Sequence, residues 1–599
     1  MRKIVVLPVF PEFPFTFWSF KKSVEYVGKK AVMPPTGLAT VLAMLPEEKF
    51  DIGRVVDMNI ESLTDEQIKC SDLIFTSTMI IQEEAHNEVV DRAHYFGKKV
   101  VAGGPFVTTY PEKTTADYIV SGEAEVTLRP FLEDLLNGAE KGVWTEKNVL
   151  GRGFVQLTKG GKVVLIDTPI PRWDLVDLNS YASAAIQFSR GCPFNCDFCD
   201  ITKLFGRESR TKTPEQMILE LDALYEAGHD GSVFFVDDNF IGNREAVRRL
   251  LPFLKNWQER NKYPFSFFTE ASLNLAWDSN LDILQGMNEA GFDSVFVGIE
   301  SVDNDVLKKM HKEQNTKMSL LDAVRRIHGA GLSASGGLIA GSDGEKPDVF
   351  DRLFNIIQEA GIPEAMPGLL TAVRGTDLYK RLESEGRIRE ESSGNNTHHL
   401  RFNFDTQLDQ EFLINGYKEF IKKLFEPGNY YPRCAVLRDN LGERRLSRKI
   451  NLNGITALGK SLRRQLFAKG GLEYASFLVK TLLKKPSYFP EAVAHAIKFD
   501  HFSAITKATL DADEYISRAD RLYDRFAQKA GKVYERQKNN LTRARQRITA
   551  VAHETLELAE DNFTKLHKDF RSGAENAYSN LRERINRDLD QFIKGYCTL

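Results

Sequence analysis

The stretch that decides the fold is Ser189-Arg190-Gly191-Cys192-Pro193-Phe194-Asn195-Cys196-Asp197-Phe198-Cys199-Asp200. Three of the six cysteines of the chain lie here, spaced Cys-x3-Cys-x2-Cys, directly after an apolar run that predicts a strand. In a reducing compartment such clustering indicates metal ligation rather than disulfides. Three thiolates can bind three irons of a [4Fe–4S] cluster and leave the fourth iron open. An open metal position is typical of a site that does chemistry.

Two other kinds of metal site fit the loop less well. A zinc site needs a fourth ligand, and no histidine lies within 25 residues of the three cysteines. A ferredoxin-like electron carrier needs a fourth cysteine at regular spacing, and none is present. We therefore expect an open cluster on these three residues. The other cysteines are scattered and are expected to be inert thiols: Cys70, Cys434 and Cys597.

A strand–helix alternation surrounds the cysteine loop and predicts six repeats. The predicted helices between the strands run over Pro214–Ala227, Arg244–Arg260, Asn280–Ala290, Met318–Gly329 and Pro347–Ala360. Six such repeats predict a partial (β/α)6 barrel over residues 185–380, with functional groups at the carboxyl ends of the strands. The predicted strands are Ile186–Ser189, Val233–Val236, Phe265–Glu270, Ser294–Glu300, Ala334–Ala340 and Ala365–Thr371.

A second α/β alternation precedes the barrel. Predicted helices at Pro35–Leu45 and Gln82–Phe96 separate short apolar strands, which indicates a parallel, doubly wound domain over residues 1–140. A less regular linker, residues 141–184, joins it to the barrel. The predicted strands are Ile4–Leu7, Leu73–Ser77, Lys99–Ala102 and Tyr118–Val120.

The overall composition narrows the class of protein. The formal net charge of −3 gives no basic footprint for nucleic acid, so no nucleic-acid partner is expected. No run of eighteen uncharged apolar residues is present, which argues against a membrane-spanning helix. The first apolar run is interrupted by Pro8, Pro11 and Glu12 and is typical of a buried strand rather than a signal peptide. A cytoplasmic location is expected.

The C-terminal part is predicted to be helical, as a mostly helical domain over residues 381–505 and a long-helix extension over 506–599. Residues 441–500 hold twelve Lys or Arg against four Asp or Glu, with leucine and phenylalanine interleaved. Such a stretch can lie peripherally on an anionic membrane. The alternative is a solvated helical cap over the barrel, and the last helices could also dimerise the chain or bind a partner.

With Phe198 before its last cysteine, the loop resembles the motif of the radical S-adenosylmethionine (SAM) superfamily. The resemblance implies that SAM chelates the open iron. An electron from a reductase or flavodoxin-type donor then cleaves SAM to a 5′-deoxyadenosyl radical. Strand-end residues are candidates for binding SAM, although each carboxylate could instead cap a helix or form a salt bridge: Asp237, Asp238, Glu270, Gly298, Glu300 and Gly337, with Phe198 beside the cluster.

The first domain resembles the cobalamin-binding domain of cobalamin-dependent radical SAM enzymes. The matching positions, which the resemblance assigns to the nucleotide tail of cobalamin, are Ser77, Thr78, Gly103, Gly104, Gly122 and Glu123. Domains that supply an axial histidine carry Asp-x-His-x-x-Gly, and here Asn59 stands where the histidine would be. The resemblance therefore implies cobalamin bound without histidine ligation (His-off). The alternative is a flavodoxin-like domain that binds no cofactor.

Further motifs resemble the subgroup that includes hopanoid C-2 methylases, over residues 1–500. They are Phe17–Phe20, Pro34–Leu38, Arg207–Lys212 and Val236–Phe240. This resemblance implies cobalamin-dependent methylation of an unactivated carbon in a small-molecule or lipid substrate such as a hopanoid. Two alternatives remain open: radical cyclisation, carbon–carbon coupling or oxidation without methyl transfer, and a non-catalytic iron–sulfur or scaffold protein.

Overall fold

The computed structural model describes residues 2–149, 163–165, 168–395, 397, 400–445, 452–537 and 539–594. It divides into two compact units, Met1–His501 and Phe502–Leu599. Part of the predicted linker and the thiol of Cys597 lie outside the described residues. No helix among the described residues is both long and apolar enough to cross a membrane.

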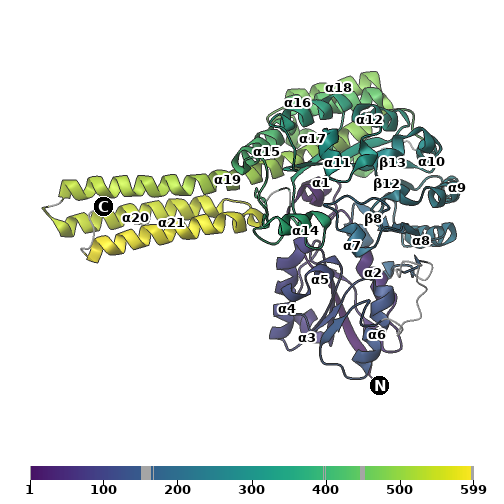
Figure 1. The fold of residues 1–599 in the computed structure, drawn as a ribbon, viewed down its shortest axis with the longest axis horizontal. Coiled ribbons are helices and arrows are strands. Elements are labelled where there is room, and N and C mark those ends of the chain that lie inside the picture. The colour runs from purple at the N-terminus through teal and green to yellow at the C-terminus, as the bar shows by residue number, and fades with distance from the viewer. Residues whose placement is uncertain are drawn as a thin grey trace. The chain divides into compact units, whose positions relative to one another are not determined.

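A parallel sheet of seven strands forms the first part of unit 1. Its order is β2-β1-β4-β5-β6-β7, with β3 also paired to β1. The apolar strands are buried because helices cover both faces, with α3, α4 and α5 on one side and α6 on the other (Figure 1). The strands are β1 (Ile4–Phe10), β2 (Phe50–Ile52), β3 (Val56–Asp57), β4 (Leu73–Ser77), β5 (Lys99–Gly103), β6 (Tyr118–Val120) and β7 (Gly142–Trp144).

This sheet confirms the predicted doubly wound fold and extends it. The sequence did not predict β2, β3 and β7, and β7 carries the sheet into the stretch expected to be linker. The helices of this part are α1 (Lys21–Tyr26), α2 (Thr36–Leu42), α3 (Asp65–Cys70), α4 (Glu83–Tyr95), α5 (Pro105–Thr109) and α6 (Ala124–Leu136).

The second sheet of unit 1 is the predicted partial barrel. Six parallel strands follow one another in the order β15-β14-β13-β12-β11-β8. Their outer face is packed with side chains such as Phe235, Phe267 and Val297, which are fully buried under the helices. The strands are β8 (Ser183–Ile186), β11 (Gly231–Phe235), β12 (Phe265–Ala271), β13 (Phe292–Glu300), β14 (Ser333–Ala340) and β15 (Ala365–Leu369).

The first barrel strand differs from its predicted bounds. β8 ends at Ile186, because Ser189 and Arg190 leave the barrel sheet and form the short strand β9 (Ser189–Arg190). β9 pairs antiparallel with β10 (Arg210–Thr211), so this two-stranded ribbon brackets the cysteine loop. The helices around the barrel are α7 (Ile201–Leu204), α8 (Pro214–Glu226), α9 (Arg244–Arg260), α10 (Leu281–Glu289), α11 (Asn304–Lys309), α12 (Leu320–Gly329), α13 (Val349–Ala360) and α14 (Asp377–Ser384).

The rest of unit 1 is helical, as expected. It comprises α15 (Gln410–Leu424), α16 (Pro427–Asn440), α17 (Leu452–Gln465), α18 (Gly471–Lys484) and the start of α19 (Phe489–Gln537). In unit 2 the rest of α19, α20 (Leu541–Thr564) and α21 (Lys568–Lys594) lie side by side (Figure 1). Phe526, Ala544, Ile548 and Ile585 are among the buried residues at the core of this bundle.

Candidate functional site

The cysteine loop begins at a glycine that no other residue could replace without strain. Gly191 has φ +87°, and a Cβ there would lie 2.5 Å from the carbonyl oxygen of Glu208. Its N–H donates to the carboxylate of Asp238 at 3.1 Å, and the next N–H, of Cys192, donates to the carbonyl of Gly206 at 3.3 Å. The chain therefore enters the loop tightly held between the end of β11 and the approach to β10.

The three thiols lie on this one loop, partly exposed, and two side-chain amides from other segments of the barrel face them. The side-chain amide of Asn239 donates to Sγ of Cys192 at 3.7 Å, and that of Gln314 donates to Sγ of Cys196 at 3.8 Å. Burial raises the pKa of all three thiols, most strongly for Cys199. Donors of this kind stabilise sulfur when it is a thiolate ligand.

No three His, Cys, Asp or Glu side chains in the described part of the chain converge on a single-ion site. This does not conflict with a cubane, whose three thiolates bind three different irons and need not converge on one point.

The two aspartates that follow β11 have different surroundings. Asp237 is buried and accepts hydrogen bonds from the N–H of Phe188 (2.8 Å) and from Oγ of Ser189 (2.7 Å). Its carboxylate therefore fixes the segment that leads into the cysteine loop. Asp238 lies against the loop itself, and burial raises its pKa to about 6. Of the two, Asp238 is the better candidate for touching a ligand.

Glu270 and Glu300 end neighbouring strands on the inner face of the barrel. Among the described residues the carboxylate of Glu270 has no hydrogen-bond partner. Burial, together with the nearby carboxylates of Asp238 and Glu300, raises the pKa of Glu270 to about 7. A half-buried acid without a hydrogen-bond partner at the carboxyl end of a barrel strand is a candidate for ligand binding.

Glu300 has an unusual backbone conformation at the end of β13. Its φ is +61°, where the strand register shifts against β14, and such strain in a non-glycine residue is typical of functional sites. Its carboxylate forms a buried ion pair with Lys312. Burial acts to lower the pKa of Lys312, but the charges of Glu300 and the Cys196 thiol outweigh it and raise the pKa.

Lys312 belongs to a short segment, residues 310–315, that joins the cysteine loop to β13. The carbonyl of Met310 accepts from the N–H of Asp197 at 3.1 Å. The side-chain amide of Asn315 donates to the carbonyl of Gly298 at 2.9 Å. The ammonium of Lys312 lies 5.8 Å from the ring centre of Phe198, which places this aromatic residue beside the buried ion pair.

The glycines of the inner face are explained partly by the protein itself. A Cβ on Gly298 would lie 2.4 Å from Oε1 of Glu300 and 2.5 Å from Nζ of Lys312, so this position makes room for the ion pair. On β14, a Cβ on Gly337 would lie 3.1 Å from the ring of Phe296 and 3.9 Å from Glu300. Both glycines therefore border Glu300, and their predicted contact with SAM stays a prediction.

Aromatic rings line the inner face below the carboxylates. Phe234 and Phe268 are register partners on β11 and β12 and stack with ring centres 4.6 Å apart. Phe296 on β13 contacts Trp18, with ring centres 5.0 Å apart. Trp18 is 45% exposed and comes from the N-terminal part of the chain. The inner face thus offers an apolar, aromatic surface beside a ring of acids.

The Ser/Thr and Gly-Gly elements of the first sheet meet at its carboxyl edge. The N–H of Thr78 donates to the carbonyl of Gly103 at 3.2 Å. Gly104 has φ +94°, and a Cβ there would lie 2.7 Å from the backbone of Thr78 and 3.1 Å from Oγ of Ser77. The buried hydroxyl of Thr78 has no hydrogen-bond partner among the described residues, so it is available to a ligand at this edge.

The Gly122-Glu123 element has another set of partners. Glu123 is buried and forms ion pairs with Arg190 (3.2 Å) and Arg210 (2.8 Å), the two residues paired across the β9–β10 ribbon. Glu125 pairs with Arg190 at 2.9 Å. Glu123 therefore holds the ribbon at the base of the cysteine loop, a role that the sequence motif did not predict.

Asn59, which stands where a cobalt-binding histidine would be, is engaged by the protein. Its side-chain oxygen accepts from the N–H of Phe13 at 2.8 Å. Its amide donates to the carbonyl of Pro11 at 3.3 Å and to Asp57 at 2.7 Å. Tyr181 donates to the other oxygen of Asp57 at 2.6 Å. These bonds hold the Asn59 side chain against the loop after β1.

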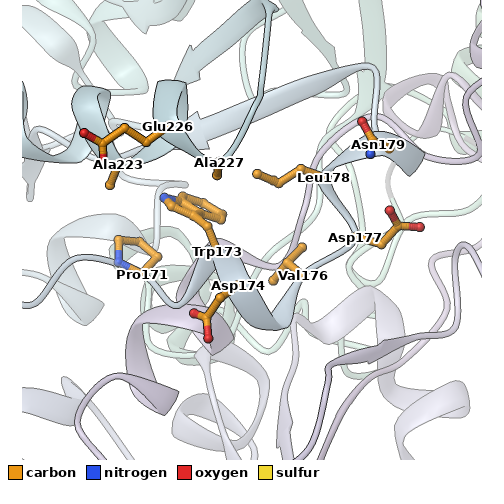
Figure 2. Close-up of a pocket in the computed structure, with 10 residues that line it drawn as sticks. All are labelled: Pro171, Trp173, Asp174, Val176, Asp177, Leu178, Asn179, Ala223, Glu226 and Ala227. Carbon is orange, nitrogen blue, oxygen red and sulfur yellow. The ribbon is translucent and has the colours of Figure 1, made fainter.

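Among the described residues, pockets lie on opposite sides of the barrel. One of about 440 Å³ lies between the linker and the end of α8 and is lined by Trp173, Leu178 and Ala227 among others (Figure 2). It lies at the amino ends of the barrel strands, opposite the cysteine loop, and holds none of the predicted site residues. The other, of about 570 Å³, includes Pro193, Arg207 and Arg244 in its wall and adjoins Cys192 along the chain.

Sequence reasoning missed several residues of this site. The contributions of Lys312 and Gln314 depend on tertiary contacts and had no local signal. The aromatic surface did have one, because Phe234, Phe268 and Phe296 alternate with core residues on their strands, as inward-facing residues do. Asn239 and Arg210 belong to the motifs Val236–Phe240 and Arg207–Lys212, but the sequence assigned no role to either residue.

Comparisons with known proteins agree with this geometry. The family model described as the radical SAM superfamily matches residues 186–357, and a domain of unknown function, DUF4070, matches residues 376–515. An uncharacterized methyltransferase of Synechocystis sp. is 41% identical over 437 residues, covering 72% of this chain and 78% of the relative. The hopanoid C-2 methylase of Rhodopseudomonas palustris is 36% identical over 424 residues, covering 70% and 77%.

Among solved structures, the radical SAM methyltransferase TsrM of Kitasatospora setae, with cobalamin and a [4Fe–4S] cluster bound, aligns with a TM-score of 0.55. It is 15% identical, and the alignment covers 84% of this chain and all of that one, so it shows a shared fold.

A six-stranded partial barrel whose first strand leads into a Cys-x3-Cys-x2-Cys loop defines a radical SAM enzyme. More closely, the chain belongs to the radical SAM methyltransferase family that includes the hopanoid C-2 methylase.

Proposed function

We propose that Cys192, Cys196 and Cys199 hold a [4Fe–4S] cluster whose fourth iron binds SAM. The observation that carries this proposal is the placement of three thiols on one loop, with amide donors from Asn239 and Gln314 facing two of the sulfurs. Phe198 and the buried Lys312 lie beside the same loop. These groups would set the polarity around the cluster.

We propose that SAM occupies the carboxyl end of the barrel, between the cysteine loop and the strand-end acids. Glu270 has an unpartnered carboxylate there and is the candidate for the ribose or the amine of SAM. Asp238 and Glu300 border the same space, and Gly298 and Gly337 make room beside it for the Glu300–Lys312 ion pair and the Phe296 ring. The acids would orient SAM by hydrogen bonds to its donor groups.

We propose that the first sheet binds cobalamin at its carboxyl edge. The order β2-β1-β4-β5-β6 reverses between β1 and β4, and open α/β sheets bind ligands at this switch point. Ser77, Thr78, Gly103 and Gly104 end the neighbouring strands, and the unpartnered Thr78 hydroxyl suits a nucleotide tail. Gly122 and Glu123 follow the next strand, although Glu123 is already paired with arginines. With Asn59 engaged by backbone, His-off binding is the form this chain supports.

Together these cofactors would supply a carbon-centred hydrogen abstraction and a transferable methyl group. We therefore propose methylation of an unactivated carbon in an apolar substrate of the hopanoid class. The aromatic surface of Trp18, Phe234, Phe268 and Phe296 supports this substrate, since it favours a rigid hydrocarbon over a polar metabolite. Peripheral contact with the membrane that holds such a lipid is part of the proposal.

The electron donor would be a reductase or a flavodoxin-type protein. The pocket that includes Pro193 lies beside Cys192 along the chain. Its wall holds three arginines (Arg207, Arg244 and Arg248) against two glutamates (Glu208 and Glu245), a small cationic excess that would favour an acidic donor. Exchange of Arg207 and Arg244 for glutamate should slow turnover with a flavodoxin and leave turnover with a chemical reductant unchanged.

The experiment that tests the proposed function is anaerobic reconstitution with iron, sulfide and cobalamin, followed by turnover with SAM bearing a deuterated methyl group and a hopanoid-containing lipid extract. A lipid product carrying the label is expected. Unlabelled, rearranged or oxidised lipid would instead support radical chemistry without methyl transfer.

A further inference from the structure

Two helices of unit 1, α17 and α18, use only one face for packing. The inner face of α17 buries Ala457, Ser461 and Gln465, and that of α18 buries Tyr474 and Phe477. Both faces meet at Tyr431 of α16. The hydroxyl of Tyr431 donates to Gln465 at 3.0 Å, and its ring lies 6.0 Å from that of Tyr474. The outer faces of the two helices therefore point away from α16.

The outer faces carry large apolar side chains in the same spacing. On α17 and the residue after it these are Ile455, Leu462 and Leu466, and on α18 they are Leu472, Val479 and Leu483. Positions i, i+7 and i+11 share one side of a helix. We call these six residues, with Phe467 in the turn between the helices, the α17–α18 stripe. Phe467 is 89%, Leu472 86% and Leu483 80% exposed.

Exposure of this extent needs an explanation, because soluble surfaces rarely present contiguous large apolar residues. Buried packing cannot account for the stripe, since the inner faces already supply it. A membrane span is also ruled out for these helices, as no described helix is long and apolar enough. A helix that is apolar on one side and packed on the other is suited to lie along an interface.

The charged residues around the stripe indicate which kind of surface it fits. Residues 452–485 hold seven lysines or arginines and a single acid, Glu473. Arg463 follows Leu462, and Lys480 and Lys484 each follow an apolar residue of the stripe. Basic residues beside exposed leucine and phenylalanine complement the anionic headgroups of a lipid bilayer. A second copy of the same basic surface would instead repel the first.

We propose that the α17–α18 stripe docks the enzyme on an anionic lipid bilayer, with Phe467, Leu472 and Leu483 entering the boundary between headgroups and acyl chains. The inference rests on the proposed function for its purpose, since a lipid substrate would be reached from that bilayer. The docking itself depends only on the stripe and its charges.

The test uses the full chain, reconstituted anaerobically, and its cosedimentation with vesicles. Binding is expected to an equal mixture of phosphatidylcholine and phosphatidylglycerol, to weaken with added salt, and to be much weaker for phosphatidylcholine alone. The double variant Leu472→Ser/Leu483→Ser should bind the mixed vesicles about tenfold more weakly or worse. Arg463→Glu/Lys480→Glu should weaken binding independently.

Tyr95→Ser is the matched control, because Tyr95 is 84% exposed on α4 and lies outside the stripe; it should bind like the wild type. Failure of the wild-type chain to bind mixed vesicles would overturn the proposal. So would a wild-type dimer, seen by sedimentation velocity, that the double variant dissociates.

SAM cleavage with a chemical reductant, measured on the same preparations, separates the two proposals. The double variant should lose vesicle binding and keep SAM cleavage. A wild-type chain that binds vesicles but cleaves no SAM would contradict the proposed function and still support docking.

Discussion

Arg210 donates from one guanidinium nitrogen to both carboxylate oxygens of Glu123, at 2.8 and 2.9 Å, and both side chains are buried. The pair joins the start of α6, beside the first sheet, to the ribbon that brackets the cysteine loop. Arg190, two residues before Cys192, shares the same carboxylate. The base of the loop is thus anchored on the neighbouring α/β layer rather than on the barrel alone.

Loss of this anchor should destabilise the chain. Glu123→Gln removes the acidic partner of the buried Arg210, while Arg190 keeps its pair with Glu125. Breaking a buried pair in this way costs about 3–5 kcal/mol. Chemical denaturation should show the loss, and iron per chain after reconstitution should fall. Glu133→Gln on the same helix is the control, because its pair with Arg129 is exposed and worth little. Equal stability of the two variants would contradict the anchoring role.

The ion pair of Lys312 and Glu300 should tune the cluster. Lys312 is buried, and its charge interacts with Cys196 and Cys199. A nearby cation favours the reduced cluster, so Lys312→Met should lower the reduction potential, by an amount on the order of tens of millivolts. A redox titration followed by electron paramagnetic resonance measures it. Lys312→Arg keeps the charge and should stay close to the wild-type potential; an equal drop in both variants would point to altered packing instead.

The raised pKa of Glu270 predicts a pH dependence of stability in the cofactor-free chain. Folding moves this pKa from 4.5 to about 7, so between these values the folded state keeps a proton that the unfolded state releases. Stability should therefore fall as pH rises through this window, by about 3 kcal/mol from this residue.

Glu270→Gln should remove the part of the pH-dependent loss of stability that comes from Glu270. Denaturation midpoints at pH 5 and pH 8 should differ less in Glu270→Gln than in the wild type. Glu88→Gln, on an exposed position of α4, should behave as the wild type does. A pH dependence that Glu270→Gln leaves unchanged would show that Glu270 ionises normally.

The hydrogen bonds of Asn59 predict the state of bound cobalamin. Because this side chain is held by Phe13, Pro11 and Asp57, we expect it not to ligate cobalt. The electron paramagnetic resonance spectrum of the cob(II)alamin form should show no nitrogen splitting from a histidine. Asn59→Ala should leave that spectrum unchanged while lowering stability by about 1–3 kcal/mol, since buried partners lose their bonds. A spectrum altered by Asn59→Ala would assign this residue to the cobalt.

The fold was largely predictable because its signals are local. Each barrel strand is an apolar run followed by a segment with apolar residues at helical spacing. The cysteine motif marks the segment that follows the first strand. Where prediction failed, the structure depends on distant partners. Ser189 was predicted to end the first barrel strand, yet Ser189 and Arg190 pair with Thr211 and Arg210, which lie about twenty residues further along the chain. A strand as short as β3, with two residues, is too short to show the alternation of apolar and polar residues that predicts a strand.

The site was predictable only where one segment carries it. The three cysteines and the strand-end acids could be found because each belongs to a motif or to a strand boundary. Lys312, by contrast, lies in an irregular segment, and only its burial against Glu300 makes it part of the site. Glu123 was found for its Gly-Glu context, whereas its partners, Arg190 and Arg210, belong to another layer of the fold.

The most direct test of the central claim is the pair of products formed from SAM. With a chemical reductant, cobalamin and the lipid substrate, the reconstituted enzyme should form both 5′-deoxyadenosine and S-adenosylhomocysteine. Cys196→Ala should lose 5′-deoxyadenosine, whereas Cys70→Ala, an exposed thiol on α3, should lose neither product. Formation of 5′-deoxyadenosine without S-adenosylhomocysteine would contradict methyl transfer, and 5′-deoxyadenosine from Cys196→Ala would contradict the cluster assignment.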